Sequence, residues 1–103
     1  MRKIAVLCIA MSSAVAVGQE YPTRPVRVIA GSPGSTSDFA ARFVAQKLSE
    51  RWGHQVVVDN RPGAGGIIGT EIGAHAAPDG YTLTVGHIGT HASAQHLFKK
   101  LPY

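Results

Sequence analysis

The sequence contains one cysteine, Cys8, among its 103 residues. Cys8 lies in an N-terminal segment that we expect to be removed, so the mature chain contains no thiol. This excludes a disulfide framework and thiolate chemistry from the mature protein. We therefore expect an ordinary hydrophobic core to hold it together.

The N-terminal segment has the pattern of a secretory signal peptide. Two basic residues precede an apolar run over residues 4–17, and small residues follow at its end. A transmembrane anchor would need about 20 apolar residues, and this run is shorter and is interrupted by two serines. We predict a signal peptide over residues 1–18, cleaved after Ala16 or Gly18.

Basic residues are few and scattered along the mature chain, residues 19–103. Removal of the predicted signal peptide leaves eight Lys and Arg against six Asp and Glu, so the formal net charge falls from +4 to +2. A nucleic-acid-binding surface requires a basic stripe with interleaved aromatic residues. The sequence has no such stripe, which argues against a nucleic-acid partner.

Several motifs that would indicate catalysis or cofactor binding are also missing. The glycine-rich stretch over residues 59–83 matches neither nucleotide fingerprint, because Ile68 stands where a dinucleotide motif needs glycine and no Gly-Lys pair completes a P-loop. His87 and His91 are four apart, but no cysteine or nearby carboxylate completes a metal-ligand set. No G-x-S-x-G elbow and no acid and base pair are present. We predict no catalytic residue, no cofactor and no metal.

The mature chain alternates β-branched runs with helical repeats. In order, we expect a strand over 26–29, a helix with apolar residues at 40, 44, 48 and 52, a strand over 56–58, a helix with apolar residues at 68, 72 and 76, a strand over 82–85, and, after a polar loop over 86–91, an amphipathic stretch over 92–99. This alternation predicts an α/β fold with three layers, built on a mostly parallel sheet with right-handed crossovers. The continuous run over 56–58 favours a strand covered on both faces.

Local signals support the two longer helices. Ser35 and Asp38 are spaced like a capping box with a shortened acid, and Gly53 stands where the first helix should end. In the second helix, Gly69 and Gly73 lie one turn apart and would let the helix approach its neighbour closely.

The loops that follow the three strands fall at one edge of the predicted sheet, the edge where such folds bind ligands. The loop over residues 32–37 gathers hydroxyl groups and backbone N–H groups at a helix start, which favours an anion such as a carboxylate or a phosphate. The alternative is that its Ser and Thr residues only cap the helix and form a turn.

Six motifs in fixed order carry a resemblance to a known family. They are Tyr21-Pro22-x-Arg24-Pro25-Val26-Arg27, a loop ending in Asp38 and followed by Ala41-Arg42, Val57-Val58-Asp59-Asn60-Arg61-Pro62-Gly63-Ala64-Gly65-Gly66, Ala77-Pro78-Asp79-Gly80-Tyr81-Thr82-Leu83, Gly89-Thr90-His91, and Lys99-Lys100-Leu101-Pro102-Tyr103. Together they resemble the N-terminal part of the tripartite tricarboxylate transporter receptors, also called Bug proteins.

The resemblance implies a periplasmic solute receptor rather than an enzyme. Such receptors have two α/β lobes of the type II periplasmic-binding-protein kind, which close around a small organic carboxylate and deliver it to a membrane permease of two subunits. The resemblance assigns ligand binding here to loop residues of the first lobe. These are Ser32, Gly34, Ser35, Thr36, Ser37, Asp38, Gly65, Gly66, Gly86, Gly89, Thr90 and His91.

The chain departs from the family pattern in two respects. The family usually has Pro-Gly-Gly in its first loop, whereas here Pro33-Gly34 is followed by Ser35-Thr36-Ser37. Family members also continue beyond the Leu101-Pro102-Tyr103 motif into a second lobe. We therefore expect residues 19–103 to be the N-terminal part of lobe one. The alternatives are a truncated, non-functional product, a small anion-binding module that dimerises, or an enzyme that uses the serine-rich loop.

Overall fold

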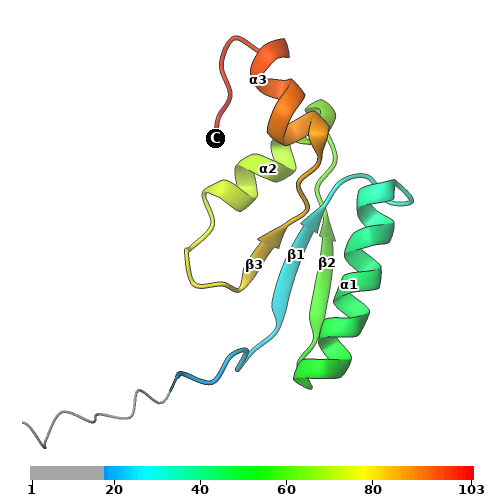
Figure 1. The fold of residues 1–103 in the computed structure, drawn as a ribbon, viewed down its shortest axis with the longest axis vertical. Helices are drawn as coiled ribbons and strands as arrows, with labels where there is room; N and C mark the ends of the chain where they lie inside the picture. Colours follow the sequence, from blue (N-terminus) through cyan, green and yellow to red (C-terminus); the bar gives the residue numbers. More distant parts are fainter. Residues whose placement is uncertain (1–17) are drawn as a thin grey trace, which may run out of the picture.

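The computed structural model describes residues 18–103, so nearly all of the predicted signal peptide lies outside the described residues. Three strands and three helices alternate along the chain (Figure 1). They are β1 (Val26–Ala30), α1 (Thr36–Trp52), β2 (Val56–Asn60), a 3₁₀ turn (Ala64–Gly66), α2 (Ile67–Ala74), β3 (Thr82–Thr84), a π-helical turn (Gly89–Ser93) and α3 (Ala94–Leu97). None of the helices in this part of the chain is long and apolar enough to cross a membrane.

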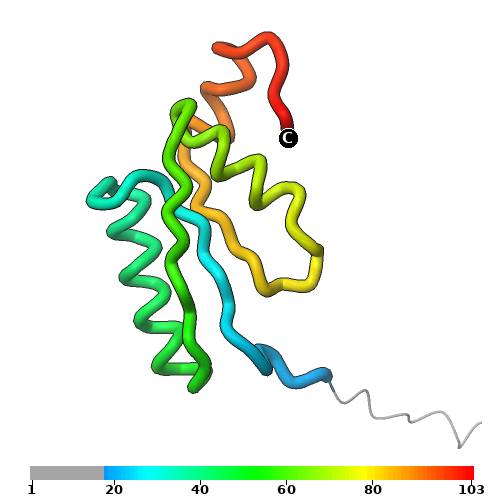
Figure 2. The backbone as a smooth tube through the Cα atoms, turned by 180° about the vertical axis from the view of Figure 1, so that it is seen from behind, coloured from blue at the N-terminus to red at the C-terminus, as the bar shows by residue number. Residues whose placement is uncertain are grey.

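The three strands form one parallel sheet in the order β2-β1-β3. Alternate residues of β1 point to opposite faces, because side chains alternate along a strand. Val28 packs with Ala41 and Ala45 of α1, whereas Ile29 lies against Gly69 of α2. Helices α1 and α2 thus cover opposite faces of the sheet, as Figures 1 and 2 show from two sides. The predicted three-layer α/β fold is confirmed.

The core lies between β1 and α1. Its buried members are Val26, Val28, Ala30, Ala41, Ala45 and Val56. The prediction that residues 56–58 form a strand covered on both faces was wrong, since Val57 is 43% exposed. The reason is the strand order. β1 takes the central position and β2 lies at an edge, whereas α2 packs on β1 and β3 and leaves one face of β2 uncovered.

Both predicted ends of the first helix are confirmed. The Ser35 hydroxyl accepts a hydrogen bond from the Asp38 N–H, so Ser35 is the N-cap residue of α1. At the other end Gly53 adopts φ 69°, a left-handed conformation that glycine reaches without strain, and its N–H bonds the Ser49 carbonyl. Local side-chain and backbone chemistry therefore sets the length of this helix.

Helix α2 packs closely through Gly69 and Gly73, as their spacing of one turn predicts. Gly69 lies against the Arg61 carbonyl, and Gly73 lies against Thr84 of β3. Of the apolar positions expected on this helix, Ile68 is 45% exposed, whereas Ile67, Gly69 and Thr70 are buried. The two glycines explain the difference: a helix that must approach β3 closely turns its smallest side chains towards the sheet.

An aromatic clasp, made of Tyr21, Trp52 and Tyr81, lies at the amino-terminal end of the sheet. The Tyr21 ring centroid lies 5.5 Å from that of Trp52 and 5.2 Å from that of Tyr81. Arg24 stacks over the Tyr81 ring at 3.9 Å from its centroid and pairs with Asp79 at 2.8 Å. The clasp ties the segment before β1 to the end of α1 and to the turn before β3.

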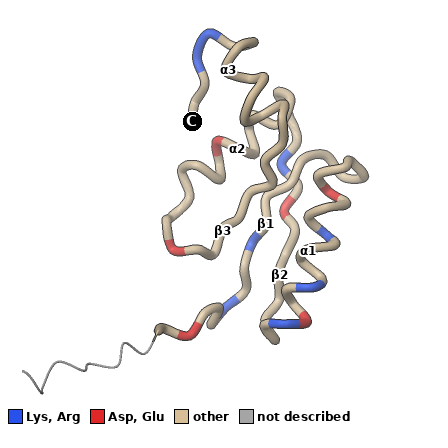
Figure 3. Tube along the Cα trace, in the orientation of Figure 1, with Lys and Arg blue, Asp and Glu red and all other residues tan. Residues whose placement is uncertain are grey.

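Charged residues are dispersed over the described chain and form no stripe (Figure 3). Ion pairs join many of them, such as Arg42 with Asp38 and Arg61 with Asp59. This dispersion agrees with the charge pattern of the sequence, which argued against a nucleic-acid partner.

Candidate functional site

The loops that follow β1, β2 and β3 meet at the carboxyl edge of the sheet, as the sequence predicts. Together they line one pocket, which we call the rim pocket. Its lining residues are Gly31, Ser32, Ser35, Ser37, Pro62, Gly63, Gly65, Gly66 and His87. A second groove adjoins it, lined by Ser35, Thr36, Ser37, Ala40, Val85, Gly86 and His87. The candidate site is therefore built from three connections that are distant in sequence.

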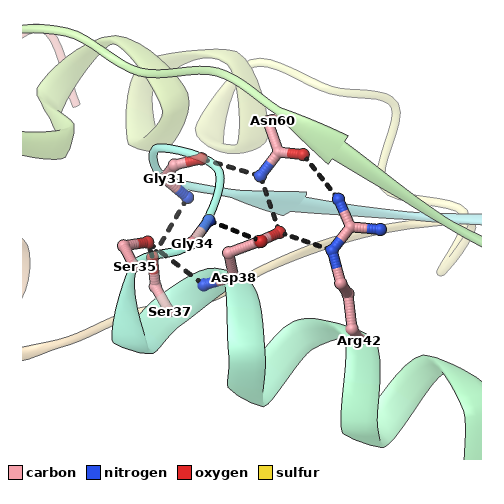
Figure 4. Close-up of polar contacts among 7 residues, drawn as sticks. All are labelled: Gly31, Gly34, Ser35, Ser37, Asp38, Arg42 and Asn60. Carbon is pink, nitrogen blue, oxygen red and sulfur yellow. Dashed lines mark hydrogen bonds and ion pairs between the residues drawn. The ribbon is translucent and has the colours of Figure 1, made fainter.

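The loop after β1 presents two serine hydroxyls to the rim pocket. The Oγ atoms of Ser35 and Ser37 lie 3.0 Å apart, and Ser37 Oγ accepts a hydrogen bond from the Gly31 N–H at 3.2 Å (Figure 4). One hydroxyl hydrogen of the pair forms the bond between them, which leaves the other hydrogen available for a ligand. Ser32 is exposed at the mouth of the pocket.

Asp38 acts as a structural brace for this loop through its hydrogen bonds, and it is only 5% exposed. One carboxylate oxygen accepts from the Gly34 N–H at 2.9 Å, and the other accepts from Asn60 Nδ2 at 2.8 Å and from Arg42 Nε at 3.0 Å (Figure 4). The Asn60 amide, the Gly34 N–H and Arg42 lower the pKa of Asp38 from 3.8 to about 2. Asp38 thus carries a fixed negative charge whose oxygens are occupied, which suits a structural brace rather than a contact to an anion.

The loop after β2 is shaped by glycine. Gly63, Gly65 and Gly66 all have positive φ, of 127°, 66° and 95°. A Cβ on Gly66 would also lie 2.8 Å from Thr90 Cγ2, so the close approach of the loops after β2 and β3 leaves no room for a side chain there. No side chain caps α2, and its first backbone N–H groups begin at the rim pocket.

The segment after β3 becomes helical earlier than predicted. Residues 86–91 were expected to form a loop, but the N–H of His91 already bonds the His87 carbonyl, and a π-helical turn begins at Gly89. This turn buries Thr90, whose hydroxyl lies within hydrogen-bonding distance of His87 N, His87 O and His91 Nδ1. Thr90 and His91 therefore stabilise the turn through hydrogen bonds.

His87 lines both the rim pocket and the adjoining groove, yet it was missing from the predicted ligand-binding residues. It lies within the polar loop over residues 86–91, but the sequence singled it out only for its i, i+4 spacing with His91, which is weak evidence for a metal site. Its position three residues after the last residue of β3 is the signal that could have found it, because ligand-binding residues follow the carboxyl ends of parallel strands. Among residues 18–103, no three His, Cys, Asp or Glu residues are grouped so as to hold a metal ion.

The structure divides the predicted site residues by the space that they line. Ser32, Ser35, Ser37, Gly65 and Gly66 line the rim pocket, and Thr36 and Gly86 line the adjoining groove. Thr90 and Arg61 line a small cavity that shares Gly31, Ser37, Gly66 and His87 with the rim pocket. Gly34, Asp38, Gly89 and His91 line none of these spaces. No Lys or Arg lines the rim pocket or the adjoining groove, and the arginines of the neighbouring segments, Arg42 and Arg61, pair with Asp38 and Asp59. An anion in the pocket would meet hydroxyls, backbone amides and one imidazole.

The sequence of this chain is similar to a defined group of bacterial proteins. Residues 40–103 match the model of the tripartite tricarboxylate transporter family receptor. A UPF0065 protein of Bordetella pertussis is 36% identical over 104 residues, covering 100% of this chain and 32% of that protein. Protein BugT of the same organism is 50% identical over 64 residues, covering 61% of this chain and 20% of BugT.

Solved structures agree with the sequence matches. The chain superposes on Rpa4515 of R. palustris with adipate at a TM-score of 0.79 and 36% identity, covering 82% of this chain and 28% of that one. MatC of Rhodopseudomonas palustris with bound malate gives a TM-score of 0.76 at 42% identity, covering 81% of this chain and 29% of MatC. The periplasmic binding protein BugD gives a TM-score of 0.58 at 45% identity, covering 62% of this chain and 22% of BugD.

The chain spans about a third of the length of the curated relatives it matches. The matched family and its solved members are substrate-binding receptors rather than enzymes. The resemblance found in the sequence motifs is thereby confirmed, and the chain belongs to the tripartite tricarboxylate transporter receptor family.

Proposed function

We propose that this chain forms the opening part of the first lobe of a periplasmic solute receptor and supplies one wall of a site for a small carboxylate. The convergence of three loops on the rim pocket carries this proposal. Relatives in structures with adipate and with malate support the choice of a carboxylate as the ligand.

The rim pocket suits a carboxylate because its polar groups can donate hydrogen bonds. Helices α1 and α2 both begin at the rim, so the positive ends of two helix dipoles point towards the same space. Ser32 and the Ser35–Ser37 pair add hydroxyl donors. Because one wall alone leaves an anion in contact with water, we expect millimolar affinity from this chain by itself.

The remainder of the proposed role concerns location and partners. A signal peptide over residues 1–18 would export the protein to the periplasm, where a receptor of this family would deliver its acid to the two membrane subunits of a permease.

The adjoining groove, with Thr36 and Gly86, would extend the site. Gly34, Asp38, Gly89, Thr90 and His91 would hold the loops in place.

A second candidate is a small anion-binding module that dimerises. Both β2 and β3 are edge strands of the sheet in the described chain, and Phe39 and Phe43 on α1 are 74% and 57% exposed. Unpaired edges and exposed aromatic side chains favour association between copies. Light scattering on the mature protein separates the candidates, since a stable compact dimer would favour the module.

A nitrogen-15 NMR titration of the mature protein with adipate, malate and the neutral analogue adipamide tests the proposed function. We expect saturable shifts in the three rim loops with the two acids and none with adipamide. Ser32→Ala should weaken binding about threefold, because it removes one hydroxyl donor from the pocket lining. Ser93→Ala, outside the pocket, serves as the matched control. Shifts that are absent, or that lie away from the loops, would refute the proposal.

A further inference from the structure

His87 lies where the three loops of the rim pocket meet. It contributes to the lining of the pocket together with residues from the loops after β1 and β2, and it also borders the adjoining groove. A Cβ placed on Gly66 would lie 3.4 Å from His87 Nε2. The distal nitrogen of the ring therefore stands beside the start of α2, where backbone N–H groups also reach the pocket.

A backbone hydrogen bond fixes the state of the His87 ring. The Gly89 N–H donates to His87 Nδ1 at 3.0 Å. A nitrogen that accepts a hydrogen bond carries no hydrogen, so the neutral ring has its hydrogen on Nε2. No atom of residues 18–103 accepts a hydrogen bond from Nε2, which leaves this donor available to a molecule in the pocket.

The other side-chain donors of the pocket are serine hydroxyls, whose direction is less fixed than that of the His87 ring. Ser35 and Ser37 share one of their two hydroxyl hydrogens, and Ser32 is exposed and makes no side-chain bond that would orient it. The lining contains no Lys or Arg. An imidazole held at one nitrogen thus provides a fixed direction for the donor at the other nitrogen.

We propose that His87 is a carboxylate-binding residue of this site. Its Nε2–H donates a hydrogen bond to one oxygen of the bound carboxylate, and the Gly89 N–H orients the ring for this contact. The proposal rests on the proposed function and deepens it, because it names the side chain that sets where the carboxylate oxygen lies.

Two amide substitutions separate this role from a structural one. In His87→Asn, the amide oxygen can replace Nδ1 as the acceptor for the Gly89 N–H, but no donor lies at the position of Nε2. In His87→Gln, an amide N–H lies near the position of Nε2, but no acceptor replaces Nδ1. Adipate and malate titrations, followed by NMR, should give binding about three- to fivefold weaker for His87→Asn and His87→Ala, and within about twofold of wild type for His87→Gln. His96→Gln, on α3 and outside the pocket, is the control and should bind as wild type.

The outcomes are distinguishable from those that test the function itself. Wild-type affinity in His87→Asn together with loss in His87→Gln would mean that the ring only supports the loop, and the inference would fail while the proposed function stands. A wild-type protein that binds neither acid would overturn both. A two-bond hydrogen–nitrogen correlation spectrum adds a test without ligand: we expect Nδ1 unprotonated and Nε2 protonated, and the opposite tautomer would overturn the inference.

Discussion

Gly73 offers a sharp test of how α2 packs on the sheet. In an exposed helix interior, replacing glycine by alanine stabilises the protein by about 1 kcal/mol, because alanine restricts the unfolded chain and favours the helix. At Gly73 the added Cβ would lie 1.9 Å from Thr84 Oγ1, 3.0 Å from Thr84 Cβ and 3.3 Å from Thr84 Cγ2. Contacts this short require the Thr84 side chain to rotate, or α2 or β3 to move.

The expected cost follows from these distances. Overpacking a tight contact costs roughly 1–3 kcal/mol, and a contact at 1.9 Å belongs at the upper end of that range. After subtracting the gain in helix propensity of about 1 kcal/mol, we expect Gly73→Ala to destabilise the protein by about 2 kcal/mol. This corresponds to a fall in Tm of roughly 8–16 °C for a domain of this size.

A double-mutant cycle with Thr84→Ala isolates the cause. Thr84→Ala removes both Oγ1 and Cγ2 and leaves the Cβ contact at 3.0 Å, so adding Gly73→Ala to this background should cost about 0–1 kcal/mol. The free energy of unfolding from urea titrations followed by circular dichroism measures all four proteins. A Gly73→Ala variant as stable as wild type, or equal costs in both backgrounds, would refute the close packing of α2 on β3.

Two further predictions concern the brace and the clasp. Because Asn60, Gly34 and Arg42 lower the pKa of Asp38 to about 2, the stability that its charge contributes should be fully present above pH 3.8 and lost as the pH falls through about 2. The Tm difference between wild type and Asp38→Asn should therefore shrink over that interval, and a constant difference would contradict the brace. Tyr21→Ala should remove one face of the clasp, destabilise the protein by about 1 kcal/mol and shift the emission of Trp52, the single tryptophan, to longer wavelength. Unchanged emission would show that the Tyr21–Trp52 contact does not form in solution.

The features that sequence could predict are those set by local chemistry. Ser35 and Gly53 mark the ends of α1 through hydrogen bonds and backbone angles that span a few residues, and both were identified correctly. The β-branched runs and the connection lengths were also sufficient to predict parallel strands with a helix between each pair.

The features that sequence could not predict depend on contacts between distant segments. The edge position of β2, and hence the exposure of Val57, follows from which strand takes the centre of the sheet. The spacing of Gly69 and Gly73 predicted a close approach of α2, but its contact with Thr84 and the exposure of Ile68 depend on the folded arrangement. The position of His87 after β3 could be predicted from the sequence, whereas its contact with the other two loops depends on the folded arrangement.

The absence of lysine and arginine from the lining of the rim pocket has a consequence for how an acid would be held there. Attraction between a ligand and a fixed cation at the surface weakens as added salt shortens the Debye length, whereas hydrogen bonds from neutral groups depend mainly on contact geometry. Retention of an acid in this pocket would therefore vary little with ionic strength. Discrimination among acids would come from the spacing of their oxygens rather than from their total charge.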